Sequence, residues 1–139
     1  MNAFKHFTPI QIRFSDIDRL DHVNNACYLN YFELGRVRYF NEVLQRIDWN
    51  VQGFVLARTE MNHLLPLHLN DTVICATRVV TIGTKSLTME NKLFRTTNGE
   101  NEEVANGLGV LVASDYLRKV PIEVPLEWRQ SIAQYEGWS

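Results

Sequence analysis

The hydrophobic positions of the chain follow a helical period early and a strand-like period over most of the remainder. Residues 24–44 contain one glycine and no proline, and apolar or small residues recur there at steps of three and four: Tyr28, Phe32, Gly35, Tyr39 and Val43. This spacing predicts a helix. Leu29, Tyr31 and Leu34 fall elsewhere on its circumference, which is typical of a helix that other structure encloses.

Strand-like segments lie on both sides of this helix. The short alternation Ile10, Ile12 and Phe14 predicts a strand over 9–15. After a loop at 48–53, four further strands are predicted, with Asn70-Asp71, Gly83 and Asn98-Gly99 as turn signals between them: 54–67, 72–82, 86–94 and 103–114. The tail over 125–139 is predicted to form a short helix or surface cap.

The last of these strands indicates where the helix lies. Small residues occupy one of its faces, Ala105, Gly107 and Gly109, whereas larger ones occupy the other, Val104, Leu108, Val110 and Val112. Glycine inside a strand is unfavourable unless another element approaches closely. We therefore expect the long helix to lie against the small face.

The predicted class is α+β, with one long central helix wrapped by an antiparallel sheet of about five strands. One helix among strands that follow each other in sequence cannot provide the crossovers of a parallel sheet. The length of 139 residues predicts a single domain over residues 1–139.

Composition narrows the function classes. Hydrophobic residues make up 45% and charged residues 22%, as in ordinary globular proteins. The formal net charge of -2 gives no general reason to bind nucleic acid or an anionic membrane. The sequence has no run of about 18 apolar residues and no apolar stretch at its start, so we expect a cytoplasmic protein without membrane insertion. Cys27 and Cys75 are expected to be core thiols.

Most of the candidate chemistry lies between the first strand and the helix. Asp16, Asp18, Asp21 and His22 fall within seven residues there. One interpretation is structural: the acids are solvated, and Asp21 or one of the asparagines at 24 and 25 caps the helix. The other is a catalytic site.

The order of residues in this segment supports the second interpretation. Asp18 followed by His22-Val23-Asn24-Asn25 resembles the 4-hydroxybenzoyl-CoA thioesterase-like branch of the hotdog superfamily, and weaker likeness extends to 31–33, 67–71, 82–86 and 105–107. The resemblance implies that the protein has a hotdog fold, hydrolyses acyl-CoA and forms a homodimer or homotetramer. It also implies an active site between subunits, with no metal and no other cofactor.

The resemblance also implies roles for individual residues. Asp18 would act either as the nucleophile or as a general base, and both routes stay open. The N–H of Asn25 would stabilise the oxyanion, helped by the positive end of the helix dipole. His22 would hold the loop, orient water or contact the thioester, or serve only in capping. Lys85 and Ser86 match a turn that faces the pantetheine or phosphates of CoA, although ordinary surface residues would also suit these positions.

Several alternatives remain at this point. A noncatalytic acyl-CoA or acyl-carrier binding module would keep the pocket without turnover, and a hotdog enoyl-CoA hydratase would use an Asp and His pair. Another hotdog branch places its carboxylate on the central helix, but Glu33 is expected to pair with Arg36. His63 and His68 are expected on opposite faces of a strand, at the surface.

Overall fold

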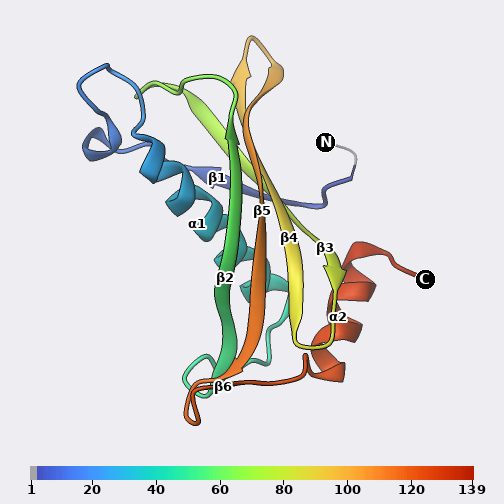
Figure 1. Cartoon of the computed structure of the whole chain (residues 1–139). Coiled ribbons are helices and arrows are strands. Elements are labelled where there is room, and N and C mark those ends of the chain that lie inside the picture. Colours follow the sequence, from blue (N-terminus) through green and yellow to red (C-terminus); the bar gives the residue numbers. More distant parts are fainter. Residues whose placement is uncertain (1–2) are drawn as a thin grey trace.

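One long helix lies across one face of a twisted antiparallel sheet in the computed structural model, which describes residues 3–139 (Figure 1). The strands of the described range are β1 (His6–Ile10), β2 (Gln52–His63), β3 (Thr72–Ile82), β4 (Ser86–Thr97), β5 (Glu100–Asp115) and β6 (Val120–Pro121). The helices are α1 (Asn25–Val43) and α2 (Leu126–Glu136), and a short 3-10 turn covers Phe14–Asp16.

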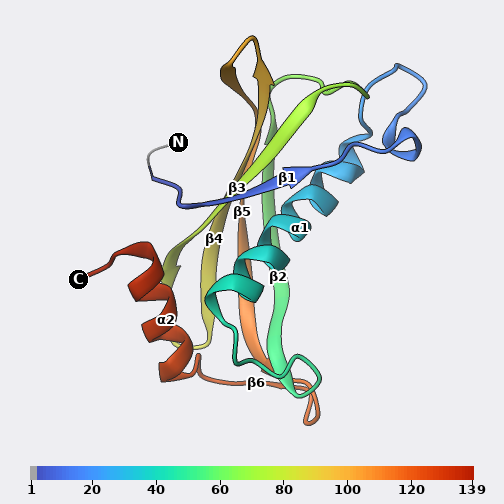
Figure 2. The same ribbon diagram turned by 180° about the vertical axis from the view of Figure 1, so that it is seen from behind.

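The sheet has the order β1-β3-β4-β5-β2, and every pair of neighbours is antiparallel. β6 pairs with β5 outside this path. Figure 2 shows α1 in front of the sheet and α2 beside its lower part. The α+β class, the single long helix and the antiparallel sheet are confirmed.

The helix lies against the small face of β5, as predicted. A Cβ added at Gly107 would overlap the carbonyl oxygen of Glu60 on β2 and would lie 2.8 Å from Cε2 of Phe32 on α1. At Gly109 an added Cβ would lie 3.8 Å from Nη1 of Arg36. Gly107 therefore lacks a side chain where the neighbouring strand and the Phe32 ring approach β5 closely, whereas the approach at Gly109 is looser.

Val104 does not lie on the outer face of β5, where simple alternation placed it. The β4–β5 register shifts between Leu93 and Phe94, which is the position of a bulge. Val104 is fully buried, and its carbonyl accepts hydrogen bonds from the N–H groups of Leu64 (2.9 Å) and Leu65 (3.2 Å). Val104 is the extra residue of this bulge, and its side chain is therefore buried in the core. Its carbonyl helps to hold the segment that follows β2.

The first strand begins earlier than predicted. β1 covers His6–Ile10, and the inward positions of this strand are His6, Thr8 and Ile10. Two of these three residues are polar, so the hydrophobic alternation becomes visible only at Ile10. Phe14 lies in the 3-10 turn and is 83% exposed, so it does not continue a strand.

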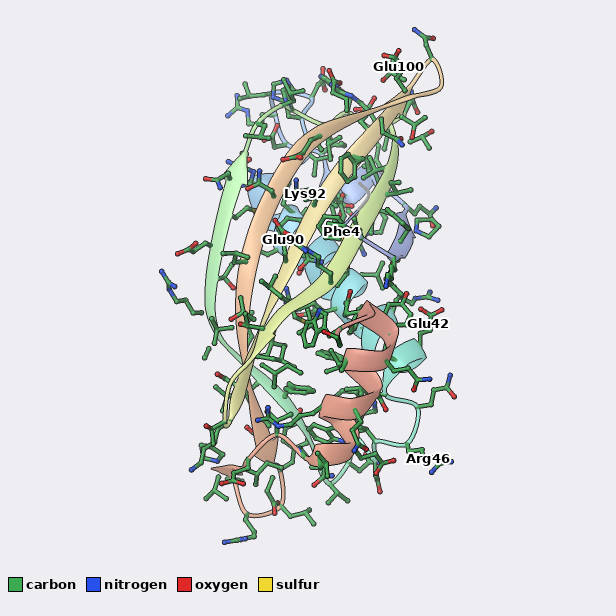
Figure 3. The ribbon with its side chains drawn as sticks, turned by 90° about the vertical axis from the view of Figure 1, so that its right-hand side faces the viewer. Phe4, Glu42, Arg46, Glu90, Lys92 and Glu100 are labelled. Atoms are coloured by element: carbon green, nitrogen blue, oxygen red, sulfur yellow. The ribbon has the colours of Figure 1, made fainter. Side chains whose placement is uncertain are left out.

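The core has two main parts along α1. Tyr28 and Phe32 pack in the first part, near the start of the helix, and Tyr39 and Phe40 pack in the second part, which includes Trp128 of α2. Phe4 packs separately near Glu90 and Lys92 of β4 (Figure 3), with Nζ of Lys92 6.0 Å from its ring centroid. None of the helices described is long and apolar enough to cross a membrane.

Candidate active site

The loop before α1 is closed at its base by backbone hydrogen bonds. Ile17 and Val23 form an isolated antiparallel bridge, and the N–H of Asp18 donates to the carbonyl of His22 at 2.8 Å. Asp21 has φ +62°, a left-handed conformation that Asp tolerates better than most residues. These backbone hydrogen bonds fix the conformation of the turn, so its side chains have defined positions.

The carboxylate of Asp18 is held by the backbone of this turn. Its Oδ1 accepts hydrogen bonds from the N–H of Leu20 at 2.9 Å and of His22 at 3.3 Å. The residue is half-buried. Across residues 3–139, no ion pair involves Asp18. The backbone thus orients the carboxylate while part of it stays open to a ligand.

The start of α1 provides a backbone donor beside this carboxylate. Asn24 is the N-cap, and its side chain accepts from the N–H of Ala26 at 2.9 Å. Asn25 occupies the first helical position, where an N–H has no partner inside the helix, and no acceptor for this group is found in the described part of the chain. The first turn, residues 25–28, carries no negative side chain. This helix end can therefore receive negative charge from a ligand.

Asp18, His22 and Asn25 line one hollow of about 290 Å³, so the structure brings these three predicted residues together. Tyr28 from α1 and His63 from the end of β2 line it as well. The segment Leu64 to Pro66, which follows β2, also contributes to the wall. The residues that border this space thus carry a carboxylate, two imidazoles and, at Asn25, a backbone N–H without an acceptor in the described part of the chain.

The two later histidines are exposed, as expected, but they do not lie on opposite faces of one strand. β2 ends at His63, so the strand alternation does not extend to His68. The His63 ring meets Tyr28 edge-on at 4.7 Å, and the His68 ring meets His22 edge-on at 5.1 Å. Both rings therefore contact residues of the hollow. No local sequence pattern predicts that these segments, which are distant in sequence, lie side by side.

Asp16 is a buried supporting residue. Its side chain is almost fully enclosed and accepts from the Tyr31 hydroxyl at 2.7 Å, from the N–H of Arg13 at 3.0 Å and from the Arg13 guanidinium. Burial opposes ionisation of Asp16, but these hydrogen bonds outweigh it and lower the pKa of the carboxyl below its usual value. Asp16 therefore ties the 3-10 turn to α1 and does not belong to the hollow.

We expect Asp16→Asn to lower the free energy of unfolding by about 1–3 kcal/mol at pH 7, because buried hydrogen bonds to a charged group are lost. Since the folded state lowers this pKa, the stabilisation is present above the unfolded value of about 4 and disappears as the pH falls through the folded value. Urea unfolding at pH 7 and pH 3 should show the gap between wild type and variant narrowing at pH 3. Tyr31→Phe removes one donor and should show part of the effect. A gap independent of pH would contradict this role.

Cys27 has the environment of an inert thiol. It is half-buried, and its Sγ lies 3.9 Å from the carbonyl oxygen of Asp16. Burial, together with the negative charge of Asp16, raises the pKa of the thiol. A thiol that resists ionisation is a poor nucleophile, which agrees with the expected packing role.

Lys85 and Ser86 lie far from this hollow within one chain. Lys85 lies in the β3–β4 turn and Ser86 is the first residue of β4, at the opposite end of the sheet from the loop that precedes α1 (Figure 1). The carbonyl of Lys85 accepts from the N–H of Ala113 at 2.8 Å, and the carbonyl of Ser86 accepts from Gly83 at 2.7 Å. One chain does not bring these two residues to Asp18.

The chain is similar in sequence and in structure to proteins named as thioesterases. The family model of the thioesterase-like superfamily matches residues 12–132. A thioesterase of Thermus thermophilus, whose crystal structure is complexed with coenzyme A and Zn, is 39% identical, with a TM-score of 0.86 over 100% of this chain and 99% of that one. A chloroplastic acyl-acyl carrier protein thioesterase of Arabidopsis thaliana is 21% identical, over 94% of this chain and 68% of its own length.

One further structure bears on the fold alone. A mutant of 4-hydroxybenzoyl-CoA thioesterase, complexed with 4-hydroxybenzoyl-CoA, has a TM-score of 0.82 at 18% identity, covering 91% of this chain and 96% of that one. The same arrangement of one helix and a wrapping antiparallel sheet is therefore present in both proteins.

Proposed function

Because the chain belongs to the thioesterase-like superfamily and has its hotdog fold, we propose that it hydrolyses acyl-CoA thioesters to the free acid and CoA, with Asp18 as the catalytic carboxylate. The observation that carries this proposal is that Asp18 and Asn25 line the same hollow, and that the backbone N–H of Asn25 has no acceptor among the described residues. A thioester carbonyl needs a nucleophile or a base on one side and a donor for its oxygen on the other.

Two routes use these groups. In the first, Asp18 takes a proton from water, and the resulting hydroxide attacks the carbonyl carbon. In the second, the carboxylate attacks directly and forms an anhydride, which water then cleaves. In both, negative charge develops on the carbonyl oxygen beside the Asn25 N–H, the carbon–sulfur bond breaks, and the departing thiolate takes up a proton. His22 supports either route, because its backbone N–H and carbonyl both bond to Asp18.

We further propose that the protein works as a homodimer or homotetramer. β2 is an edge strand of the sheet, and residues 55–60 of this strand are all exposed, including Val55 (51%) and Leu56 (43%). An unpaired edge with exposed aliphatic side chains favours association with a second copy. A CoA contact by Lys85 and Ser86 would also require a second chain. Sedimentation equilibrium should give at least twice the monomer mass of 16.2 kDa.

Free-thiol release from a panel of acyl donors tests the reaction. The panel contains short, long and aromatic acyl-CoAs, together with the matching acyl-acyl carrier proteins, because one relative is named for that carrier. We expect turnover of at least one acyl-CoA. Binding of acyl-CoA without thiol release from any donor would instead favour a noncatalytic binding module, and hydration of crotonyl-CoA would favour a hydratase. A cytoplasmic location stays a prediction.

A further inference from the structure

The C-terminal helix holds the turn between β3 and β4. Nη2 of Arg129, in α2, donates to the carbonyl oxygens of Gly83 and Thr84, the latter at 3.1 Å. Nε of the same side chain donates to the carbonyl of Val124 at 3.2 Å, and the N–H of Val124 donates to the carbonyl of Thr84 at 2.9 Å. Arg129 therefore ties the turn both to α2 and to the stretch before it, and Figure 1 shows α2 beside this end of the sheet.

The carbonyl oxygens of this turn have donors within the chain, whereas two of its N–H groups have no acceptor. The carbonyls of Lys85 and Ser86 accept from the N–H groups of Ala113 (2.8 Å) and Gly83 (2.7 Å), in addition to the two carbonyls that Arg129 binds. In the described part of the chain, no acceptor is found for the N–H of Thr84 or of Lys85. Both residues are exposed. Over residues 3–139, the ammonium group of Lys85 forms no ion pair.

Adjacent backbone N–H groups beside a lysine suit the oxygens of a phosphate. We propose that Arg129 is a positioning residue for acyl-CoA. By binding the carbonyl oxygens of the turn, it keeps the N–H groups of Thr84 and Lys85 and the ammonium group of Lys85 in place for the phosphates of the CoA moiety. This inference rests on the proposed function, in which the turn of one copy meets the substrate held at Asp18 of another. Arg129 itself does not need to touch the substrate.

The guanidinium of Arg129 suits this task better than an ammonium group would. Its donors lie in a rigid plane, so one side chain reaches carbonyl oxygens of two backbone segments at once. A lysine carries the same charge as a compact group on a flexible stem. Arg129→Lys therefore keeps the charge and loses most of the positioning, which separates the two effects.

The docking of α2 does not depend on Arg129 alone. Trp128 and Ile132 are buried in the core beside α1. The Glu136 carboxylate accepts from the Tyr39 hydroxyl at 2.6 Å and from the N–H of Val79 at 3.1 Å. Loss of the Arg129 side chain should therefore leave α2 in place and release only the turn.

Isothermal titration calorimetry with CoA tests the binding part of this role. Wild type should bind CoA, and Arg129→Met should bind it at least about tenfold more weakly, because the turn is no longer preorganised. Arg129→Lys should lose nearly as much. Gln130→Met is the matched control, since Gln130 is the next residue of α2 and is exposed, and it should bind CoA as wild type does.

Steady-state hydrolysis of one acyl group on two carriers tests the positioning part. Acyl-CoA has the phosphates, and the matching N-acetylcysteamine thioester lacks them. Arg129→Met should raise KM for acyl-CoA at least about fivefold with kcat changed less than about twofold, because the lost contacts bind ground state and transition state alike. The KM for the N-acetylcysteamine thioester should stay near that of wild type. A merely structural role would change both substrates alike.

Several results would overturn the proposal. These are no binding of CoA by wild type, unchanged CoA affinity in Arg129→Met, wild-type affinity in Arg129→Lys, or equal losses on the two thioesters. If wild type binds CoA but releases no thiol from any donor, the proposed hydrolysis fails, and the CoA titrations still decide the role of Arg129.

A double variant keeps the test decisive if Arg129→Met does not fold. Lys85→Met and Arg129→Lys should each weaken CoA binding, and the double variant should lose less than the product of the two single losses, because both changes act through one turn. A loss equal to the full product would show that Arg129 acts independently of the turn.

Discussion

Replacing Asp18 with asparagine should slow thiol release from acyl thioesters by roughly three orders of magnitude in a protein that still folds. The amide oxygen of asparagine can accept the same bonds from the N–H groups of Leu20 and His22, so the turn before α1 should keep its shape. The amide can neither take a proton from water nor attack the carbonyl effectively. Steady-state thiol release and far-UV circular dichroism together measure the two outcomes.

Asp21→Asn is the matched control for this experiment. Asp21 lies in the same turn and is exposed, and asparagine tolerates its positive φ as well as aspartate does. The control removes the same charge and should retain near wild-type activity. Comparable losses in both variants, or substantial turnover by Asp18→Asn, would show that Asp18 is not the catalytic carboxylate.

Gly107→Ala should lower the free energy of unfolding by about 3 kcal/mol, at the upper end of typical overpacking effects. The new Cβ would overlap the carbonyl oxygen of Glu60 on the paired strand and press on the Phe32 ring. A backbone oxygen in a sheet cannot move without disturbing the β2–β5 ladder, which pairs Gly107 with Met61. Relief of this contact would therefore also disturb the segment that carries His63.

Gly109→Ala is the matched control, two residues along the same face. Its nearest neighbours would be Cδ1 of Leu56 at 3.4 Å and Cδ1 of Leu111 at 3.7 Å, which are ordinary contacts with flexible side chains. Its effect should stay within about 1 kcal/mol, because alanine also restricts the unfolded chain. Urea unfolding of both variants at one fixed protein concentration tests the difference. Equal effects at the two positions would contradict the close approach at Gly107.

The parts of the fold that were predictable are those whose side-chain pattern matches their burial. The helix was expected over 24–44 and forms over Asn25–Val43, and the strand expected over 72–82 is β3, Thr72–Ile82. The pattern fails where polar residues face inward, as His6 and Thr8 do in β1. It also fails at Val104, where a bulge shifts the alternation by one residue.

The candidate site was predictable only in its local part. Asp18, His22 and Asn25 lie within eight residues of sequence, so one turn and one helix start suffice to bring them together. The contributions of His63 and His68 depend on where β2 ends and on the loop that follows, and neither is encoded near Asp18. The buried Asp16 could not be distinguished from its neighbours, because its partner Tyr31 lies fifteen residues away.

The uncharged first turn of α1 represents a trade-off between folding and reactivity. An acidic residue at positions 25–28 would stabilise the helix by about 0.3–1 kcal/mol through the dipole. It would also repel the negative charge that develops on a carbonyl oxygen at the same helix end. By placing Asn, Ala, Cys and Tyr there, the sequence forgoes a common source of thermal stability. Stability engineering that adds an acid to this turn would therefore act against turnover.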